Sequence, residues 1–117
     1  MKYSDLRVWQ EAMNLVTEIY RMTKTFPSEE KYGLANQIQR TAVSVPSNIA
    51  EGQGRKSTNA YVNHLSIAFG SLMELETQVQ IAARLEYITE DNANRLLART
   101  DQVGKMIGAL KKSLSKS

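Results

Sequence analysis

Apolar residues recur at three- and four-residue steps along most of the chain, which is the spacing of one face of an α-helix. No segment shows the strict alternation of apolar and polar residues that is typical of a half-buried strand. Four such stretches are separated by short breaks. The pattern therefore predicts four helices, at residues 5–25, 28–51, 57–85 and 89–114.

Local signals place the helix ends. Pro27 stops the first helix because the residue before a proline is pushed out of the helical region. Residues 28–31 read as the start of the second helix, since acidic residues in a first turn face the positive end of the helix dipole. Ser57 or Thr58 caps the third helix, and Thr89 caps the fourth.

The second helix contains a proline. Pro46 cannot donate a hydrogen bond to the carbonyl of Ala42, and its ring crowds the preceding turn. The apolar pattern nevertheless resumes at Ile49. We expect either one helix, kinked near Pro46 and continuing to Glu51, or two short helices joined at residues 45–46.

Short connections between long helices favour antiparallel neighbours, so we predict an all-α, up-down-up-down four-helix bundle. Its 117 residues form one domain, residues 1–117. No secretory signal and no membrane span are visible, so we expect a cytoplasmic protein without membrane contact. With no cysteine and one histidine, the chain offers no familiar thiolate or metal chemistry, and we expect neither a metal nor a cofactor.

The charge is uneven along the chain. The formal net charge is +3, but residues 1–91 sum to −2 and residues 92–117 to +5. On a helical wheel, five basic residues of the fourth helix share one side, away from the apolar stripe. These residues are Arg95, Arg99, Lys105, Lys112 and Lys116.

Such a stripe of cations is an electrostatic footprint for a phosphate backbone. The alternative is a solvated helix face whose cations favour the negative end of the helix dipole. Arg55 and Lys56 form a second basic spot, next to two glycines. The glycine spacing there does not match a phosphate-binding loop, and no aromatic residues alternate with the basic ones.

One acidic residue breaks the pattern of the third helix. Glu76 falls among the apolar residues on the wheel, whereas Glu74 points the opposite way. A carboxylate on the core side must be paired, hydrogen-bonded or protonated. We predict a polar network that joins Glu76 to the second helix, with Asn48 as a member. No nucleophile, second carboxylate or histidine accompanies Glu76 at a catalytic spacing, so we expect no enzyme activity.

Two glycines lie inside the predicted fourth helix. Gly104 and Gly108 share one side with Leu97. Glycine inside a helix costs about 0.8–1 kcal/mol relative to alanine, so a pair on one side suggests that another backbone approaches there. The partner is either another helix of the bundle or another subunit.

Three segments carry a resemblance to a known family. They are the opening residues 5–10, the block Ser44-Val45-Pro46-Ser47-Asn48-Ile49-Ala50-Glu51-Gly52-Gln53-Gly54-Arg55, and residues 64–78 with the turn at 85–88. They resemble the bacterial four-helix-bundle proteins named after a product of intervening sequences in 23S ribosomal RNA genes. That family includes the accessory protein of diversity-generating retroelements.

The resemblance implies an antiparallel four-helix bundle assembled as a ring-like homopentamer. It also implies nucleic-acid binding, as in the retroelement accessory proteins, and it supplies no catalytic residues. Our leading hypothesis is a non-enzymatic oligomeric protein that contacts RNA or DNA through the basic surface of the fourth helix. The alternative is a protein-interaction scaffold or adaptor for a partner such as a polymerase.

Overall fold

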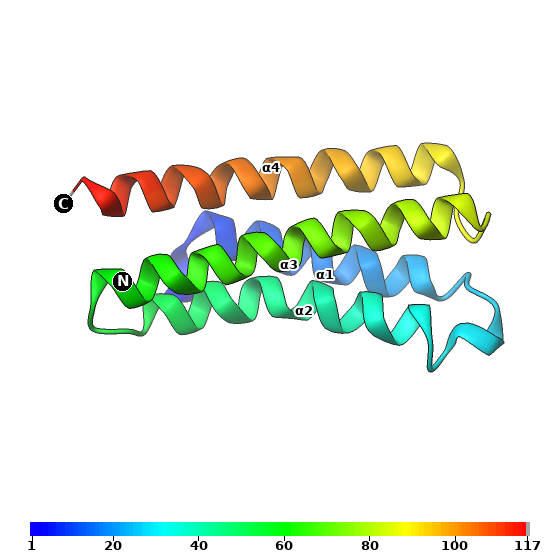
Figure 1. The fold of residues 1–117 in the computed structure, drawn as a ribbon, viewed down its shortest axis with the longest axis horizontal. Coiled ribbons are helices and arrows are strands. Elements are labelled where there is room, and N and C mark those ends of the chain that lie inside the picture. Colours follow the sequence, from blue (N-terminus) through cyan, green and yellow to red (C-terminus); the bar gives the residue numbers. More distant parts are fainter. Residues whose placement is uncertain (117) are drawn as a thin grey trace.

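The computed structural model describes residues 1–116. Its long helices are α1 (Arg7–Thr23), α2 (Leu34–Gln53), α3 (Thr58–Arg84) and α4 (Glu90–Ser115). Two short 3-10 helices, η1 (Tyr3–Asp5) and η2 (Ser28–Glu30), precede α1 and α2. Successive long helices run in opposite directions (Figure 1), which confirms the predicted four-helix bundle. The molecule measures 47 × 24 × 20 Å.

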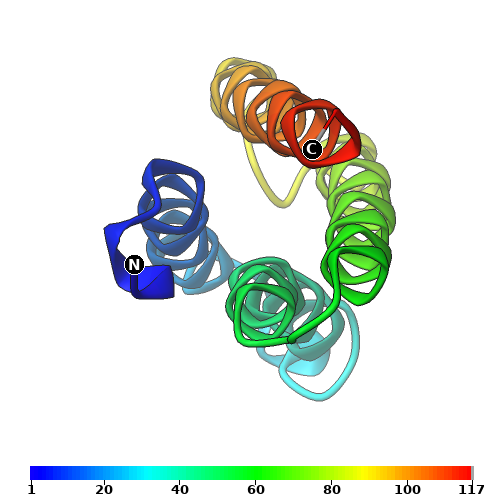
Figure 2. The ribbon, with the colours of Figure 1, turned by 90° about the vertical axis from the view of Figure 1, so that its left-hand side faces the viewer.

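The four helices follow one another around the bundle in chain order. Seen from one end, α2 lies between α1 and α3, and α4 lies beside α3 (Figure 2). Helices α1 and α4 make the least extensive contact of the neighbouring pairs. The side of the bundle between α1 and α4 is therefore its most open side.

The start of the second helix differs from the prediction by six residues, because α2 begins at Leu34. Residues 28–30 form a single 3-10 turn, and the chain turns again at Gly33 before α2 begins. Glu30 Oε1 accepts a hydrogen bond from the backbone N–H of Leu34 at 3.1 Å. This acid therefore caps α2 from outside the helix instead of occupying its first turn.

Helix α2 runs through its proline. Pro46 lies inside one continuous helix that ends at Gln53, which excludes two separate short helices. The proline is buried and lines a groove beside Trp9 of α1. Pro46 therefore leaves the helix without one internal hydrogen bond, to the carbonyl of Ala42, and does not end it.

The predicted apolar stripes form the core. Burying one large aliphatic side chain stabilises the fold by about 1.5–3 kcal/mol relative to exposing it. The largest side chains that are almost fully buried are Leu15, Ile19, Ile38, Val45, Ile49, Leu65, Leu72, Leu75, Val79, Leu96, Val103 and Ile107. Phe69, which follows Leu65 at the four-residue step of the same helix, is 40% exposed and lies at the edge of the core.

Both predicted caps are present. The hydroxyl of Ser57 accepts a hydrogen bond from Ala60 N–H, and that of Thr89 accepts one from Asn92 N–H. They begin α3 and α4 where the sequence places them. Within residues 1–116, no helix combines the length and apolarity that crossing a bilayer demands.

Helix α3 ends in a left-handed turn. Glu86 has φ 63°, and its N–H donates to the carbonyl of Ala83 while the N–H of Tyr87 donates to that of Ala82. This pair of bonds is the Schellman motif, in which glycine usually occupies the left-handed position. Here a glutamate occupies it, so the sequence carries no glycine signal for the turn.

Candidate nucleic-acid interface

Two of the five cations predicted on α4 are engaged within the chain. Arg95 donates a hydrogen bond to Glu18 Oε1 at 3.0 Å, and Arg99 forms an ion pair with Glu18 Oε2 at 3.0 Å. Glu18 belongs to α1, and its side chain is only 17% exposed. The predicted basic stripe is therefore interrupted, because one carboxylate offsets two of its guanidinium groups.

Lys105 also has an acidic neighbour, one turn away on α4. Its Nζ lies 3.2 Å from Asp101 Oδ2, and both side chains are largely exposed. An exposed pair of this kind contributes about 0–1 kcal/mol and is screened by salt. Lys105 is thus held only weakly.

The other four predicted cations gather at one end of the molecule, which we call the basic end: Arg55, Lys56, Lys112 and Lys116. This is the end where the α2–α3 loop and the last turns of α4 meet (Figure 1). Across the described residues 1–116, none of the four side chains forms an ion pair. They are the cations most available to an external anion.

The charge of the whole chain also differs between the two ends of the bundle. The half that contains the basic end, residues 1–12, 45–70 and 104–116, holds eight basic and three acidic residues. The other half, residues 13–44 and 71–103, holds seven basic and nine acidic residues. The balances are +5 and −2, so the bundle is electrically polar along its length.

Close packing of α2 on α3 supports the basic end. A Cβ atom on Gly52 would lie 2.8 Å from Cβ of His64 and 3.0 Å from Cδ1 of Tyr61. One turn earlier on α2, Asn48 Oδ1 lies 3.1 Å from His64 Nδ1, while its amide donates to Ser44 O. Because a carbonyl oxygen only accepts, His64 donates from Nδ1.

The predicted network between Glu76 and the second helix is wrong. Glu76 Oε2 accepts a hydrogen bond from the Thr100 hydroxyl at 2.7 Å, so Glu76 joins α3 to α4. Glu74 makes the contact with α2 instead, by accepting from Thr41 at 3.2 Å. Asn48 belongs to the separate pair with His64, three turns away along α3. The wheel had the correct angle for Glu76, but α4 lies on that side.

The two glycines of α4 have different surroundings. A Cβ on Gly104 would meet side chains of α3, with Phe69 Cε1 at 3.4 Å and Leu72 Cδ2 at 3.3 Å. A Cβ on Gly108 would have no atom of residues 1–116 within 4 Å. Gly104 therefore accommodates α3 side chains, whereas nothing described within the subunit accounts for Gly108. Leu97, on the same side, is half-buried against the core.

Two uncharged surfaces run along the bundle. The first, the α1/α2 seam, is a groove of about 330 Å³ lined by Tyr3, Trp9, Met13, Val16, Val43, Pro46, Ser47 and Ala50. The second, the α3/α4 seam, consists of Phe69, Gly70, Met73 and Gly108, which lie at helical spacings around the contact of Phe69 with Gly104. Met13 of the first seam and Met73 of the second are both more than a third exposed. Both seams present apolar side chains to solvent.

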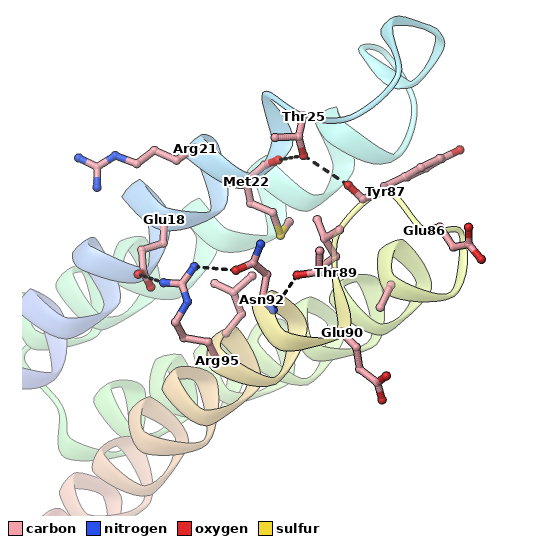
Figure 3. Close-up of a pocket in the computed structure, with 13 residues that line it drawn as sticks. Glu18, Arg21, Met22, Thr25, Glu86, Tyr87, Thr89, Glu90, Asn92 and Arg95 are labelled. Carbon is pink, nitrogen blue, oxygen red and sulfur yellow. Dashed lines mark hydrogen bonds and ion pairs between the residues drawn. The ribbon is translucent and has the colours of Figure 1, made fainter.

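A third surface feature is a cleft of about 830 Å³ between the end of α1 and the start of α4. Arg95 lies between Glu18 and Asn92 at its wall, and Met22 points into it (Figure 3). The hydroxyls in the cleft are occupied, since Thr25 donates to backbone carbonyls and Thr89 caps α4. No nucleophile–base pair is present among the residues that line it.

At the end of the bundle opposite the basic end, a hydrogen bond that was not predicted joins two distant segments; we call it the clasp. The Tyr87 hydroxyl donates to Glu30 Oε2 at 2.8 Å and thereby ties the α3–α4 turn to the start of α2. The bonds from Leu34 and Tyr87 lower the pKa of Glu30, and the bond to Glu30 raises the pKa of Tyr87. The two residues are 57 positions apart, so no local pattern could have paired them.

Comparison with known proteins gives two matches. A family model described as "23S rRNA-intervening sequence protein" matches residues 4–109. A crystal structure of a protein with unknown function from the S23 ribosomal protein family, from Bacteroides thetaiotaomicron, is 25% identical with a TM-score of 0.84. That match covers 96% of this chain and 99% of the other. No match was found among curated proteins.

Proposed function

The chain belongs to the 23S rRNA-intervening sequence protein family, and from that premise we propose that it is a non-enzymatic, homo-oligomeric protein that binds RNA or DNA through its basic end. The observation that carries the proposal is the group of Arg55, Lys56, Lys112 and Lys116, which has no acidic partner within residues 1–116. These cations would release counterions from a phosphate backbone on binding.

The contact surface that we propose does not include the first turns of α4. Arg95 and Arg99 share the carboxylate of Glu18, so a phosphate would have to compete with an existing ion pair for them. At the basic end no such competition arises. The interface we propose is therefore the end of the bundle and not the whole side of α4.

Self-association is supported by the two seams. The α1/α2 seam is a groove and the α3/α4 seam carries the exposed Phe69 and Met73, so the two surfaces differ in shape. Unlike surfaces associate head to tail, and a head-to-tail contact that closes gives a ring. We propose that a second copy covers each seam and, following the family resemblance, that the ring is a pentamer. Light scattering should then give a mass several times the 13.2 kDa of one chain, and a stable monomer at micromolar concentration would contradict it.

The test of nucleic-acid binding compares two fourfold variants of equal net charge. The first is Arg55→Gln, Lys56→Gln, Lys112→Gln and Lys116→Gln. The control neutralises four cations of the opposite half, Arg21→Gln, Lys24→Gln, Lys31→Gln and Arg84→Gln. Each variant lowers the net charge from +3 to −1.

Fluorescence anisotropy with labelled RNA and DNA, over a series of salt concentrations, is the measurement. We expect the basic-end variant to lose roughly tenfold or more in affinity and to show a shallower salt dependence, while the control stays close to wild type. Equal losses in both variants would mean that only net charge matters. Absence of wild-type binding at about 50 mM salt would contradict the function itself.

A second candidate is a protein-interaction scaffold, in which a seam receives another protein, for example a polymerase. The uncharged groove of the α1/α2 seam favours it, because apolar patches on a surface often mark protein contacts. Copurification from the native host with and without nuclease separates the two. A protein that remains bound after nuclease treatment, with no nucleic acid retained, would favour the scaffold.

A further inference from the structure

We infer that the assembly is one-faced: the basic ends of all copies lie on one face and together bind a single nucleic-acid duplex through its phosphates. This inference rests on the proposed function and adds to it the class of ligand and the way in which copies share it. It follows from three features of one chain, namely the direction of the seams, the polarity of the charge, and the absence of a stacking surface beside the basic end.

The first feature is that both seams lie on the sides of the bundle and not at its ends. The α1/α2 seam extends from Tyr3 of η1 to Val16 of α1, and the α3/α4 seam covers Phe69 to Met73 near the middle of α3. Copies that are joined along these sides lie next to one another, with their bundle axes side by side. Rotation about a single axis leaves every copy the same way up, so like ends fall on the same face.

The second feature is the charge of those ends. The half with the basic end has a balance of +5 and the opposite half a balance of −2. Side-by-side copies with the same direction therefore add their basic ends on one face. An antiparallel two-fold pair would instead place each basic end beside the acidic half of its partner and cancel much of this field.

The third feature is the lack of an exposed aromatic platform. The half with the basic end has two exposed aromatic residues, and both belong to seams: Tyr3 packs edge-on against Trp9 at 5.3 Å in the α1/α2 seam, and Phe69 lies in the α3/α4 seam. Tyr61 is half-buried, and burial raises its pKa. Sequence-independent binding of single strands uses bases stacked on aromatic rings, so this end favours recognition of the phosphate backbone.

The spacing of the basic ends favours a duplex. The bundle is 20–24 Å across, so neighbouring basic ends would stand about that far apart. A duplex is stiff over about 150 base pairs and carries one charge per ~1.7 Å. Because it is already stiff, it can span several basic ends without giving up chain flexibility on binding. A duplex of about 24 base pairs carries about 46 phosphates, more than the roughly 20 basic-end cations that five copies would supply. One duplex would therefore occupy the face.

The experiment uses the wild-type oligomer and five labelled ligands. They are DNA and RNA duplexes of about 24 base pairs, DNA and RNA duplexes of about 8 base pairs, and an unstructured single strand of about 24 nucleotides. Anisotropy gives the affinities, and native mass spectrometry gives the number of ligands per oligomer. The DNA and RNA arms show which duplex is preferred.

We expect one long duplex per oligomer, bound roughly tenfold or more tightly than the short duplex at equal phosphate concentration. One long duplex per subunit, or affinity independent of length, would overturn the one-faced assembly while the proposed function survives. Tighter binding of the single strand would overturn the duplex class. Failure of all five ligands to bind would remove the proposed function as well.

Discussion

At the scale of single residues, Gly52 marks the tightest contact between α2 and α3. A Cβ at this position would clash with Cβ of His64, which belongs to a helix and cannot move aside easily. We predict that Gly52→Ala destabilises the protein by about 1–3 kcal/mol, the usual cost of overpacking. Chemical denaturation with circular dichroism measures the loss.

The control for this prediction lies two residues away. A Cβ on Gly54 would make only ordinary contacts, 3.7 Å from the carbonyl oxygens of Ala50 and Glu51, and its φ is −79°. Gly54→Ala should therefore be neutral or stabilise by up to about 1 kcal/mol. Equal effects of the two substitutions would show that packing against His64 is not the cause.

A substitution at Glu86 should raise the stability of the protein, whereas Gly52→Ala should lower it. Its φ of 63° costs a residue with a side chain about 1–2 kcal/mol, whereas glycine adopts it freely. We predict that Glu86→Gly raises stability by about 1 kcal/mol in thermal or chemical denaturation. Glu86→Ala removes the same carboxylate but retains the backbone penalty, so a matching gain in Glu86→Ala would assign the effect to charge.

Single residues also show what sequence patterns can and cannot predict. The wheel placed Glu76 at the correct angle but assigned it to α2, because periodicity gives a direction around one helix and not the identity of the neighbour. Glu86 gave no signal, since the usual glycine of a helix end is missing. Ser57 and Thr89 were predicted correctly because a cap acts on its own helix.

At the scale of elements, the clasp between Glu30 and Tyr87 couples the start of α2 to the α3–α4 turn. The pKa of Glu30 in the folded chain lies below its ordinary value of 4.5. Its contribution to stability is therefore complete above pH 4.5 and is lost as the pH falls through the lowered pKa. The clasp should hold at neutral pH and fail in acid.

We predict that Glu30→Gln lowers the melting temperature at pH 7 and that the difference from wild type narrows as the pH falls below 4.5. Melting curves of both proteins across this range measure it. Glu29→Gln is the matched control, since Glu29 is exposed and its carboxylate makes no hydrogen bond with the described residues. A constant difference between wild type and Glu30→Gln at all pH values would contradict the titration of Glu30.

The contact between α1 and α4 depends on Glu18. Replacing Glu18 by glutamine removes two ion pairs with partly exposed arginines, for which about 1 kcal/mol in total is a reasonable loss. The same change frees Arg95 and Arg99, so we predict a steeper salt dependence of nucleic-acid binding. Denaturation and salt titrations test the two effects.

Asp101→Asn serves as the comparison for Glu18→Gln. It frees Lys105 from an exposed pair and should change stability by less than about 0.5 kcal/mol. If Glu18→Gln left both stability and salt dependence unchanged, the ion pairs across α1 and α4 would carry little energy.

At the scale of the whole molecule, the fold rearranges the charge that the sequence displays. Along the chain the excess of cations falls in residues 92–117, which suggests a basic helix. In space, α4 spans the full bundle, so Arg95 and Arg99 lie in the acidic half while Lys112 and Lys116 join Arg55 and Lys56. Helix number and order could be predicted from periodicity, but this redistribution depends on which helix ends meet.

Head-to-tail assembly makes a specific prediction. Val43→Glu places a charge in the α1/α2 seam, and Met73→Glu places one in the α3/α4 seam; both residues are more than a third exposed, so the fold should survive. Because every head-to-tail contact uses one seam of each kind, each variant alone should be monomeric. An equal mixture should form heterodimers and nothing larger, since only one intact pair of seams remains.

Light scattering of each variant and of the mixture is the measurement. If like seams paired with like, each variant would still form dimers alone, and mixing would add no new species. Circular dichroism of the variants confirms that a monomer is folded.

The even number of antiparallel helices has a practical consequence. Residues 1 and 116 both lie at the basic end, so an affinity tag fused at either terminus would lie at the same end as the four cations (Figure 1). A histidine tag there would compete with any nucleic acid or add its own charge. A circular permutant that joins the termini and opens the chain at the α3–α4 turn would carry its tag at the opposite end and leave the cations clear.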